Sequence, residues 1–290
     1  MQSLIRRIYR ERRRMAIFGT MAALSGYLFF IGDVRTLHGL PISTVASLGF
    51  AGGLTLLGLI VCLLMPAYRF VLEALGLMLL VYAVLSIYIP ALNVDSAAIP
   101  IVNVILFMGG AQLLHHLFYG AWSDKYLNQA VHIDRATTLT DMDQEDLWLS
   151  LFPDPHTREY YFDDTLIEMD RVDGRPDALH VVNSRGNGMF VEQMVHFDQI
   201  KRGWSFRTVY EVLGRARGKS GKLPTYTLVF EPRDADLAVH IRWERYDFPT
   251  RRAMMHWIDD WAGRKLDEMV VKSEAKMAQI NAAMGYGQEA

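Results

Sequence analysis

The side chains that most often carry chemistry are few in this sequence, and their spacing fits no common catalytic motif. The single cysteine, Cys62, lies inside an apolar segment, so neither an internal disulfide nor a cysteine-based metal site can form. The sequence has no HExxH zinc motif, no phosphate-binding P-loop and no GxGxxG fingerprint. Four histidines of the second half occur singly, and we expect them on outer faces: His180, His196, His240 and His256. We therefore expect no metal and no cofactor, and we assign no catalytic residue.

Polar side chains inside apolar segments form a second group, because such residues are costly in a bilayer and are commonly functional. Glu73 lies near the start of the third apolar segment, and Gln112, His115 and His116 near the end of the fourth. If these segments are helices, Glu73 could pair with a histidine in a proton relay or a metal site. The alternative is that all four side chains reach water at the membrane surface. We exclude haem b, which needs facing histidines, because the other histidine of this region, His38, lies in the opposite loop.

Aromatic side chains supply a third candidate site, one that would bind a ligand. In three strand-like runs, 204–212, 225–232 and 237–248, the bulky apolar side chains mostly occupy alternate positions and so share one face. A concave apolar face with a few polar groups suits a hydrophobic ligand, whereas the alternative is an ordinary filled core. The candidate ligand-binding residues are Gln193, Trp204, Phe206, Thr208, Tyr210, Tyr226, Phe230, Ile241, Trp243, Met254, Trp257 and Trp261.

Two different regions must position these groups. The 290 residues are 51% hydrophobic with a mean hydropathy of +0.10, and nearly all of the apolar surplus precedes residue 120. Four apolar segments, 15–32, 43–65, 69–89 and 99–119, are each near the roughly 20 residues that a membrane-spanning helix needs. We predict a basic juxtamembrane segment 1–14, four transmembrane helices within 15–120, a linker 121–129, a soluble domain 130–281 and a tail 282–290.

Arginine and lysine set the expected orientation. Six arginines precede the first apolar segment. The first loop has only Arg35 and the third loop has no basic residue, whereas Arg69 lies in the second loop and Lys125 and Arg135 follow the fourth segment. Both termini are therefore expected in the cytoplasm of a multi-pass inner-membrane protein. A signal peptide is disfavoured, because three further apolar segments follow. The basic loop 215–222 could touch anionic lipid or be a plain solvated hairpin, and the small-residue pair Gly49 and Gly53 could support a homodimer.

In the second region, apolar and polar residues alternate as they do in the strands of a sheet. The predicted strands are 130–138, 165–171, 178–184, 189–197, 204–212, 225–232 and 237–248. The later connections are too short for a parallel crossover, so the sheet is predicted to be an antiparallel meander. A short helix follows the first strand, with Asp141 and Gln144 at capping-box spacing. One long amphipathic helix, capped by Thr250 and reaching about residue 280, would cover the aromatic face.

This order of elements, together with the stretch TLTDMDQEDLWLSLFPDP at 138–155, resembles the START-like superfamily, also called SRPBCC, which has polyketide cyclase/dehydrase and lipid-transport members. The resemblance covers about residues 130–280. It implies an α+β helix-grip domain, in which an antiparallel meander sheet wraps a long C-terminal helix and many members hold an apolar cavity. The four-helix, all-α membrane anchor departs from the usual soluble members, and a tethered domain cannot carry cargo far.

Three functional hypotheses remain open from the sequence. The first is a cytoplasmic START-like domain that binds a lipid or isoprenoid-like hydrophobic ligand at the membrane surface. The second is a cyclase- or dehydratase-like enzyme acting in the same cavity, which would need a buried titratable residue there. The third is a non-catalytic membrane assembly module. A net charge of −2 gives no case for nucleic acid as a partner.

Overall fold

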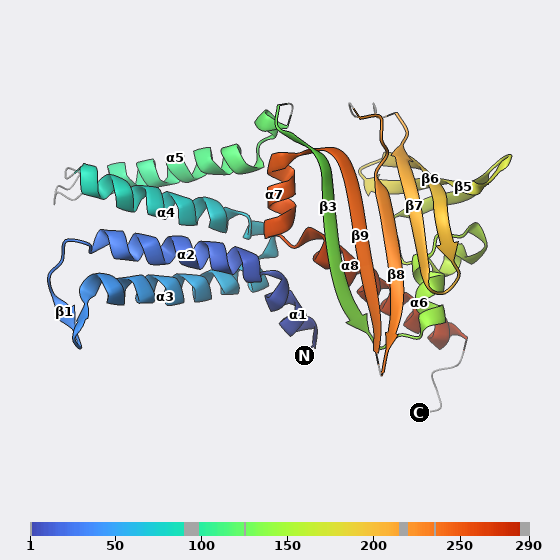
Figure 1. Ribbon diagram of the computed structural model, residues 1–290, viewed down its shortest axis with the longest axis horizontal. Helices are drawn as coiled ribbons and strands as arrows, with labels where there is room; N and C mark the ends of the chain where they lie inside the picture. Colours follow the sequence, from blue (N-terminus) through green and yellow to red (C-terminus); the bar gives the residue numbers. More distant parts are fainter. Residues whose placement is uncertain (1, 90–98, 125, 215–219, 235, 285–290) are drawn as a thin grey trace. The chain divides into compact units, whose positions relative to one another are not determined.

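The computed structural model describes residues 2–89, 99–124, 126–214, 220–234 and 236–284 (Figure 1). The chain divides into two compact units, Met1–Tyr126 with Ile258–Asp260, and Leu127–Trp257 with Trp261–Ala290. Most of the predicted basic loop, residues 215–219, and the end of the predicted tail, residues 285–290, lie outside the described residues.

The first unit is helical. Its elements are α1 (Gln2–Arg10), α2 (Arg12–Phe29), the small hairpin β1 (Thr36–Leu37) and β2 (Leu40–Pro41), α3 (Ile42–Leu64), α4 (Val71–Tyr88) and α5 (Ile99–Tyr119). Among the described residues, three stretches are long and apolar enough to cross a membrane: Ile42–Leu64, Val71–Tyr88 and Val104–Ser123. The remaining helix, α2, begins with three consecutive arginines, so the count of four spans stays a prediction.

Helix α2 packs against α3 and α4 within this unit. Phe18 is buried, and its ring fills the space left by two glycines, Gly58 of α3 and Gly76 of α4. Gly26 lies so close to α3 that a Cβ atom would come within 2.7 Å of the Ala46 carbonyl oxygen. Small residues thus permit the close approach of these helices.

A buried ion pair joins α2 to α4. The Arg14 guanidinium, 1% exposed, donates from Nε to Glu73 Oε1 at 2.6 Å and from Nη1 to Glu11 Oε2 at 3.1 Å. Glu73 is 4% exposed, so the expectation that it reaches water or pairs with a histidine is wrong. The arginine that directly precedes the first apolar segment is the better partner, because a buried carboxylate needs an opposite charge fixed beside it.

The second unit is built on a seven-stranded antiparallel sheet, as the meander pattern predicted. Its spatial order is β3-β9-β8-β7-β6-β5-β4, in which six strands follow chain order and β3 joins the end by pairing with β9. The strands are β3 (Asn128–Thr140), β4 (Leu166–Val172), β5 (Arg175–Gly186), β6 (Met189–Lys201), β7 (Ser205–Val212), β8 (Thr225–Arg233) and β9 (Asp236–Pro249).

Three helices accompany this sheet: α6 (Gln144–Leu151), α7 (Thr250–Ile258) and α8 (Trp261–Ala283), the last crossing one face of the sheet in Figure 1. The single helix predicted from Thr250 is wrong, because it breaks at Asp259 and Asp260. Asp260 adopts a positive φ of 45°, which aspartate tolerates better than most residues, and acidic side chains at a helix C-terminus oppose its dipole. The cap of α6 is Asp143 instead of Asp141.

The core lies between the sheet and α8. Phe206, Phe230 and Ile241 of the strands are at most 2% exposed, and they pack in one cluster with Leu266 and Val270 of α8. Hydroxyls of β3 fix the same helix at its side. Thr138 Oγ1 donates to Asp267 Oδ1 at 2.7 Å, and Thr140 Oγ1 donates to Glu274 Oε1 at 2.8 Å. This arrangement is consistent with the α+β helix-grip fold that the resemblance implied.

Candidate functional site

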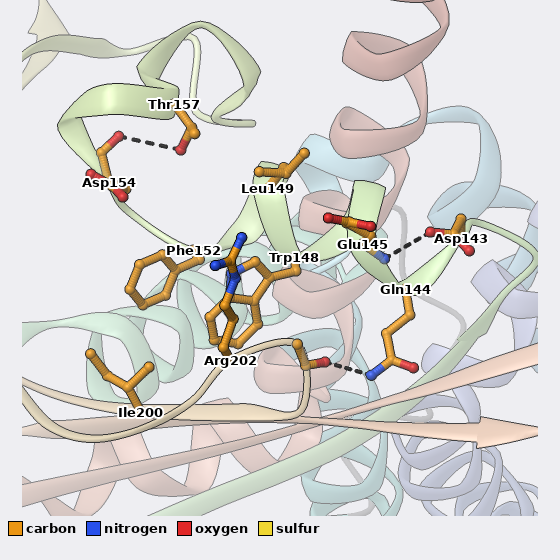
Figure 2. A pocket seen from close by; sticks show the side chains of 11 residues that line it. Asp143, Gln144, Glu145, Trp148, Leu149, Phe152, Asp154, Thr157, Ile200 and Arg202 are labelled. Atoms are coloured by element: carbon orange, nitrogen blue, oxygen red, sulfur yellow. Dashed lines mark hydrogen bonds between the residues drawn. The ribbon is translucent and has the colours of Figure 1, made fainter.

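An open pocket of about 620 Å³ lies between α6 and the turn that joins β6 to β7 (Figure 2). Its lining combines a hydrophobic floor with a charged rim. The residues that line it are Asp143, Gln144, Glu145, Trp148, Leu149, Phe152, Asp154, Thr157, Ile200, Arg202 and Gly203.

Hydrogen bonds hold the two walls in place. Asp143 caps α6 by accepting a hydrogen bond from the Glu145 backbone N–H at 2.9 Å. Gln144 Nε2 then donates to the Gly203 carbonyl oxygen at 2.6 Å, which ties α6 to the β6–β7 turn. Gly203 has a φ of 77°, a left-handed conformation that favours glycine, so this turn geometry depends on the residue type.

The third wall is the helical turn Pro155–Tyr160, which follows α6. Asp154 caps it by accepting from the His156 backbone N–H at 3.2 Å, and its carboxylate also lies 3.6 Å from Arg171 Nη2. Two of the three carboxylates that line the pocket, Asp143 and Asp154, therefore serve as helix caps.

Apolar side chains form the floor of the pocket. The Trp148 indole is 7% exposed and stacks on Phe152 with ring centroids 4.7 Å apart. Ile200, half exposed, closes the side formed by β6. A ligand placed here would cover aromatic and aliphatic surface, which favours an apolar group.

The pocket also offers an uncommitted positive charge. Arg202 is exposed and, within the part of the chain that the structure describes, makes no hydrogen bond or ion pair. Figure 2 shows its side chain extending from the β6–β7 turn toward α6. A guanidinium in this state can bind a carboxylate or a phosphate bidentately. The site can thus accept a ligand with an apolar body and an anionic end.

The residues expected to bind a ligand lie elsewhere, and none of the twelve lines this pocket. Phe206, Thr208, Phe230 and Ile241 are buried, while Gln193, Tyr210, Tyr226, Trp243 and Trp261 are partly buried. Trp204, Met254 and Trp257 were expected under the sheet, but this placement is wrong, since their side chains are 55%, 41% and 53% exposed. Trp204 precedes the first paired residue of β7, and α7 buries Ala253, Met255 and Ile258 instead.

Four aromatic members of that set, one buried and three partly buried, pack against each other. Ring centroids are 5.9 Å apart for Phe206 and Tyr226, 5.0 Å for Tyr226 and Trp243, and 4.6 Å for Trp243 and Trp261. Burial raises the pKa of the Tyr226 phenol, whose hydroxyl lies 4.0 Å from Met269 Sδ. These contacts are those of a packed aromatic core. Whether the same residues also bind a ligand stays a prediction.

Sequence reasoning missed the pocket because the β6–β7 turn, which forms one wall, lies more than 40 residues along the chain from the two adjacent segments that form the others. Its α6 wall falls within the stretch 138–155 on which the family resemblance rests, so a signal was present there. The other wall offered only Lys201, Arg202 and Gly203 as turn residues. Nothing in their spacing indicated that Arg202 would face Trp148.

A second group of chemical side chains meets at β3, β9 and α7. His132 Nε2 and His256 Nδ1 lie 3.1 and 3.2 Å from the same oxygen of Asp134, to which Arg245 Nη1 donates at 2.6 Å. The expectation of an outer-face His256 is therefore wrong. Burial lowers the pKa of His132, and for Asp134 the hydrogen bond from His256 and nearby positive charges outweigh burial and lower its pKa.

Comparison with known proteins gives no family assignment. Neither a scan of protein-family models nor a search of curated proteins finds a match. Among solved structures, Ara h 8.0201 is 10% identical with a TM-score of 0.39, covering 51% of this chain and 99% of its own. SA2116 from Staphylococcus aureus, a protein of unknown function, is 10% identical with a TM-score of 0.40, covering 52% and 98%. At identities and TM-scores this low, we base no functional argument on these likenesses.

Proposed function

We propose that this chain is an integral membrane protein of the inner membrane whose START-like domain binds an amphipathic, lipid-like ligand in the pocket between α6 and the β6–β7 turn. The observation that carries the proposal is the position of the Arg202 guanidinium, which makes no ion pair with the described residues, beside the Trp148–Phe152 floor. The ligand's apolar body would cover the aromatic rings, and its carboxylate or phosphate would bind Arg202.

The helical first unit would place the chain close to a supply of such ligands. Three stretches of the first unit have the length and apolar composition of membrane spans, so the chain can reside where amphiphiles are concentrated. The six arginines before residue 15 favour a cytoplasmic N-terminus, and an even number of spans would leave the START-like domain on the same side. We propose both termini in the cytoplasm.

Binding of a fluorescent fatty acid to the full chain in lipid nanodiscs tests this function. Arg202→Ala should weaken binding about 10- to 100-fold, because a hydrogen bond to a charged group contributes about 1.5–3 kcal/mol. Ile200→Glu should abolish measurable binding to the pocket, since it places a carboxylate beside the apolar tail and opposite Arg202.

A matched control separates the pocket from the bilayer. Val229→Glu makes a similar change from aliphatic to acidic at a β8 residue that is 40% exposed and does not line the pocket. It should bind the probe as the natural chain does. Equal binding by the natural chain, Arg202→Ala and Ile200→Glu would contradict the proposed function.

A further inference from the structure

We propose that His132, Asp134 and His256 form a binding site for a borderline divalent transition metal, of which Zn²⁺ is the best fit. The three side chains come from β3 and α7, and one ligand atom from each lies within 4.8 Å of the others. The site is separate from the α6 pocket and shares no residue with it.

Two of the three distances among the ligand atoms match tetrahedral coordination. Zinc bonds to imidazole nitrogen and carboxylate oxygen are about 2.0–2.2 Å long, so neighbouring ligand atoms of a tetrahedron stand about 3.3 Å apart. His132 Nε2 and His256 Nδ1 lie 3.1 and 3.2 Å from Asp134 Oδ2. Small rotations of these side chains would point all three atoms at one ion. Two imidazoles and a carboxylate are a ligand set that Zn²⁺ accepts, with a fourth position left open.

An unsatisfied nitrogen is the second observation that points to a ligand. His132 Nε2 is buried and lies 3.1 Å from Asp134 Oδ2, but it makes no well-aligned hydrogen bond with any described residue. A buried polar atom without a hydrogen bond is costly, and a metal bond would satisfy it. The ring is held by stacking on Phe248, with centroids 4.9 Å apart, so it is preorganised.

Strand geometry explains how two of the ligands meet. His132 and Asp134 are two residues apart on β3, so their side chains leave the same face of the sheet. His256 comes from α7, the helix that follows β9 directly, and stacks on Trp261 with centroids 4.7 Å apart. Aromatic rings thus fix both imidazoles beside the carboxylate.

Arg245 is the competitor of the metal. Its Nη1 donates to Asp134 Oδ2 at 2.6 Å and contacts His256 Nδ1 at 3.1 Å, which is where the ion would sit. The guanidinium carbon also lies 4.2 Å from the centre of the Trp261 ring. Arg245 can therefore leave Asp134 and keep a cation–π contact with Trp261, so that metal binding exchanges one cation for another.

This exchange predicts opposite effects for neighbouring substitutions. The full chain is stripped with a chelator, and Zn²⁺ alone is titrated by calorimetry in lipid nanodiscs. The natural chain should bind one equivalent. His132→Ala and Asp134→Asn should each weaken binding by at least about 100-fold, because even outer partners of metal ligands are worth 10- to 100-fold. Arg245→Met should tighten binding about tenfold or more, since the ion no longer displaces a charged hydrogen bond.

His180→Ala is the matched control. His180 is a half-exposed histidine of the same sheet, 3.7 Å from Glu192, and its loss should leave zinc affinity unchanged. If His132→Ala fails to fold, Arg245→Met still tests the proposal, because the proposal predicts that this variant binds zinc more tightly than the natural chain. Zinc binding by Arg245→Met alone, no stoichiometric binding by any variant, or an affinity that His132→Ala and Asp134→Asn leave unchanged would each overturn the proposal.

Discussion

At the scale of single residues, the two groups with chemical potential differ in how their charges are used. Arg202 projects from a turn and makes no ion pair with the described residues, whereas Arg245 is 12% exposed and bound to Asp134. A free guanidinium over aromatic surface recruits an anion, while an engaged one must be displaced. An arginine therefore offers a binding site for an anion at the α6 pocket, whereas at Asp134 an arginine already occupies the site and must be displaced.

Tyr226 tests whether the aromatic core is tightly packed. Burial raises the pKa of its phenol, so the folded chain holds it neutral, and its stabilising contribution is complete below its ordinary value near pH 10. That contribution should be lost as the pH rises through the folded pKa. As the pH is raised from about 8 to about 11, the melting temperature of Tyr226→Phe should therefore fall less than that of the natural chain.

The control for this prediction is Tyr126→Phe, since Tyr126 is 79% exposed and its removal should not change the alkaline slope. Melting is followed by circular dichroism of the full chain. A Tyr226→Phe variant with the natural alkaline slope would show that the phenol ionises freely, as it would beside an open, water-filled cavity.

The sequence predicted which strand side chains are buried better than it predicted which side chains meet in candidate sites. Alternation in 225–232 and 237–248 correctly placed Tyr226, Phe230 and Ile241 on the inner face, because strand periodicity is fixed by the backbone. The meeting of His132 with His256 could not be predicted, since it depends on how α7 leaves β9, which no local pattern encodes. The position of Arg202 in a pocket could not be predicted either, because basic turn residues are usually solvated.

At the scale of elements, the helical unit depends on the buried pair of Arg14 and Glu73. Breaking a buried ion pair from one side leaves an uncompensated charge and typically costs about 3–5 kcal/mol. We expect Arg14→Met and Glu73→Leu each to lower the thermal stability of the full chain in detergent strongly. The double variant should recover part of the loss of Arg14→Met, because Glu73 no longer remains as a buried carboxylate without its guanidinium, while Glu11 and Asp259 still lose their bonds to Arg14. Losses that simply add in the double variant would contradict this account.

Close helix contact in the same unit rests on Gly26. A Cβ there would meet backbone of α3 at Ala46, so Gly26→Ala forces the helices apart and should cost about 1–3 kcal/mol. Gly52→Ala, in α3, is the control, because among the described residues no atom outside the helix's own nearby backbone lies within 4 Å of the added Cβ atom. Thermal melts in detergent compare the two variants, and equal stability would contradict the packing.

The expected homodimer through Gly49 and Gly53 stays a prediction that crosslinking can test.

Elements were predicted well where the pattern is long. The meander order and the apolar helices follow from periodicity and connection length, which are properties of the local sequence. The break between α7 and α8 was missed because Met254, Trp257 and Ile258 continue a plausible stripe into Trp261. Two consecutive aspartates, one of them left-handed, interrupt that stripe in a way that only the tertiary structure fixes.

At the scale of the whole molecule, the orientation in the membrane is the prediction with the widest consequence. In a Cys62→Ser background, a membrane-impermeant maleimide should label Leu37→Cys, in the loop between α2 and α3, in intact cells. Ser220→Cys, in the second unit, should be labelled only after lysis, since basic residues retain the N-terminus and the second loop in the cytoplasm. The reverse pattern would contradict cytoplasmic termini.

The central claim is that the α6 pocket holds an amphiphile. Native mass spectrometry of the full chain, released gently from nanodiscs, tests it most directly. The account predicts a reproducible added mass on the natural chain and on Val229→Glu that is missing from Ile200→Glu, with other lipid adducts unchanged. An added mass that persists in Ile200→Glu, or its absence from the natural chain after exposure to a lipid extract, would contradict the claim.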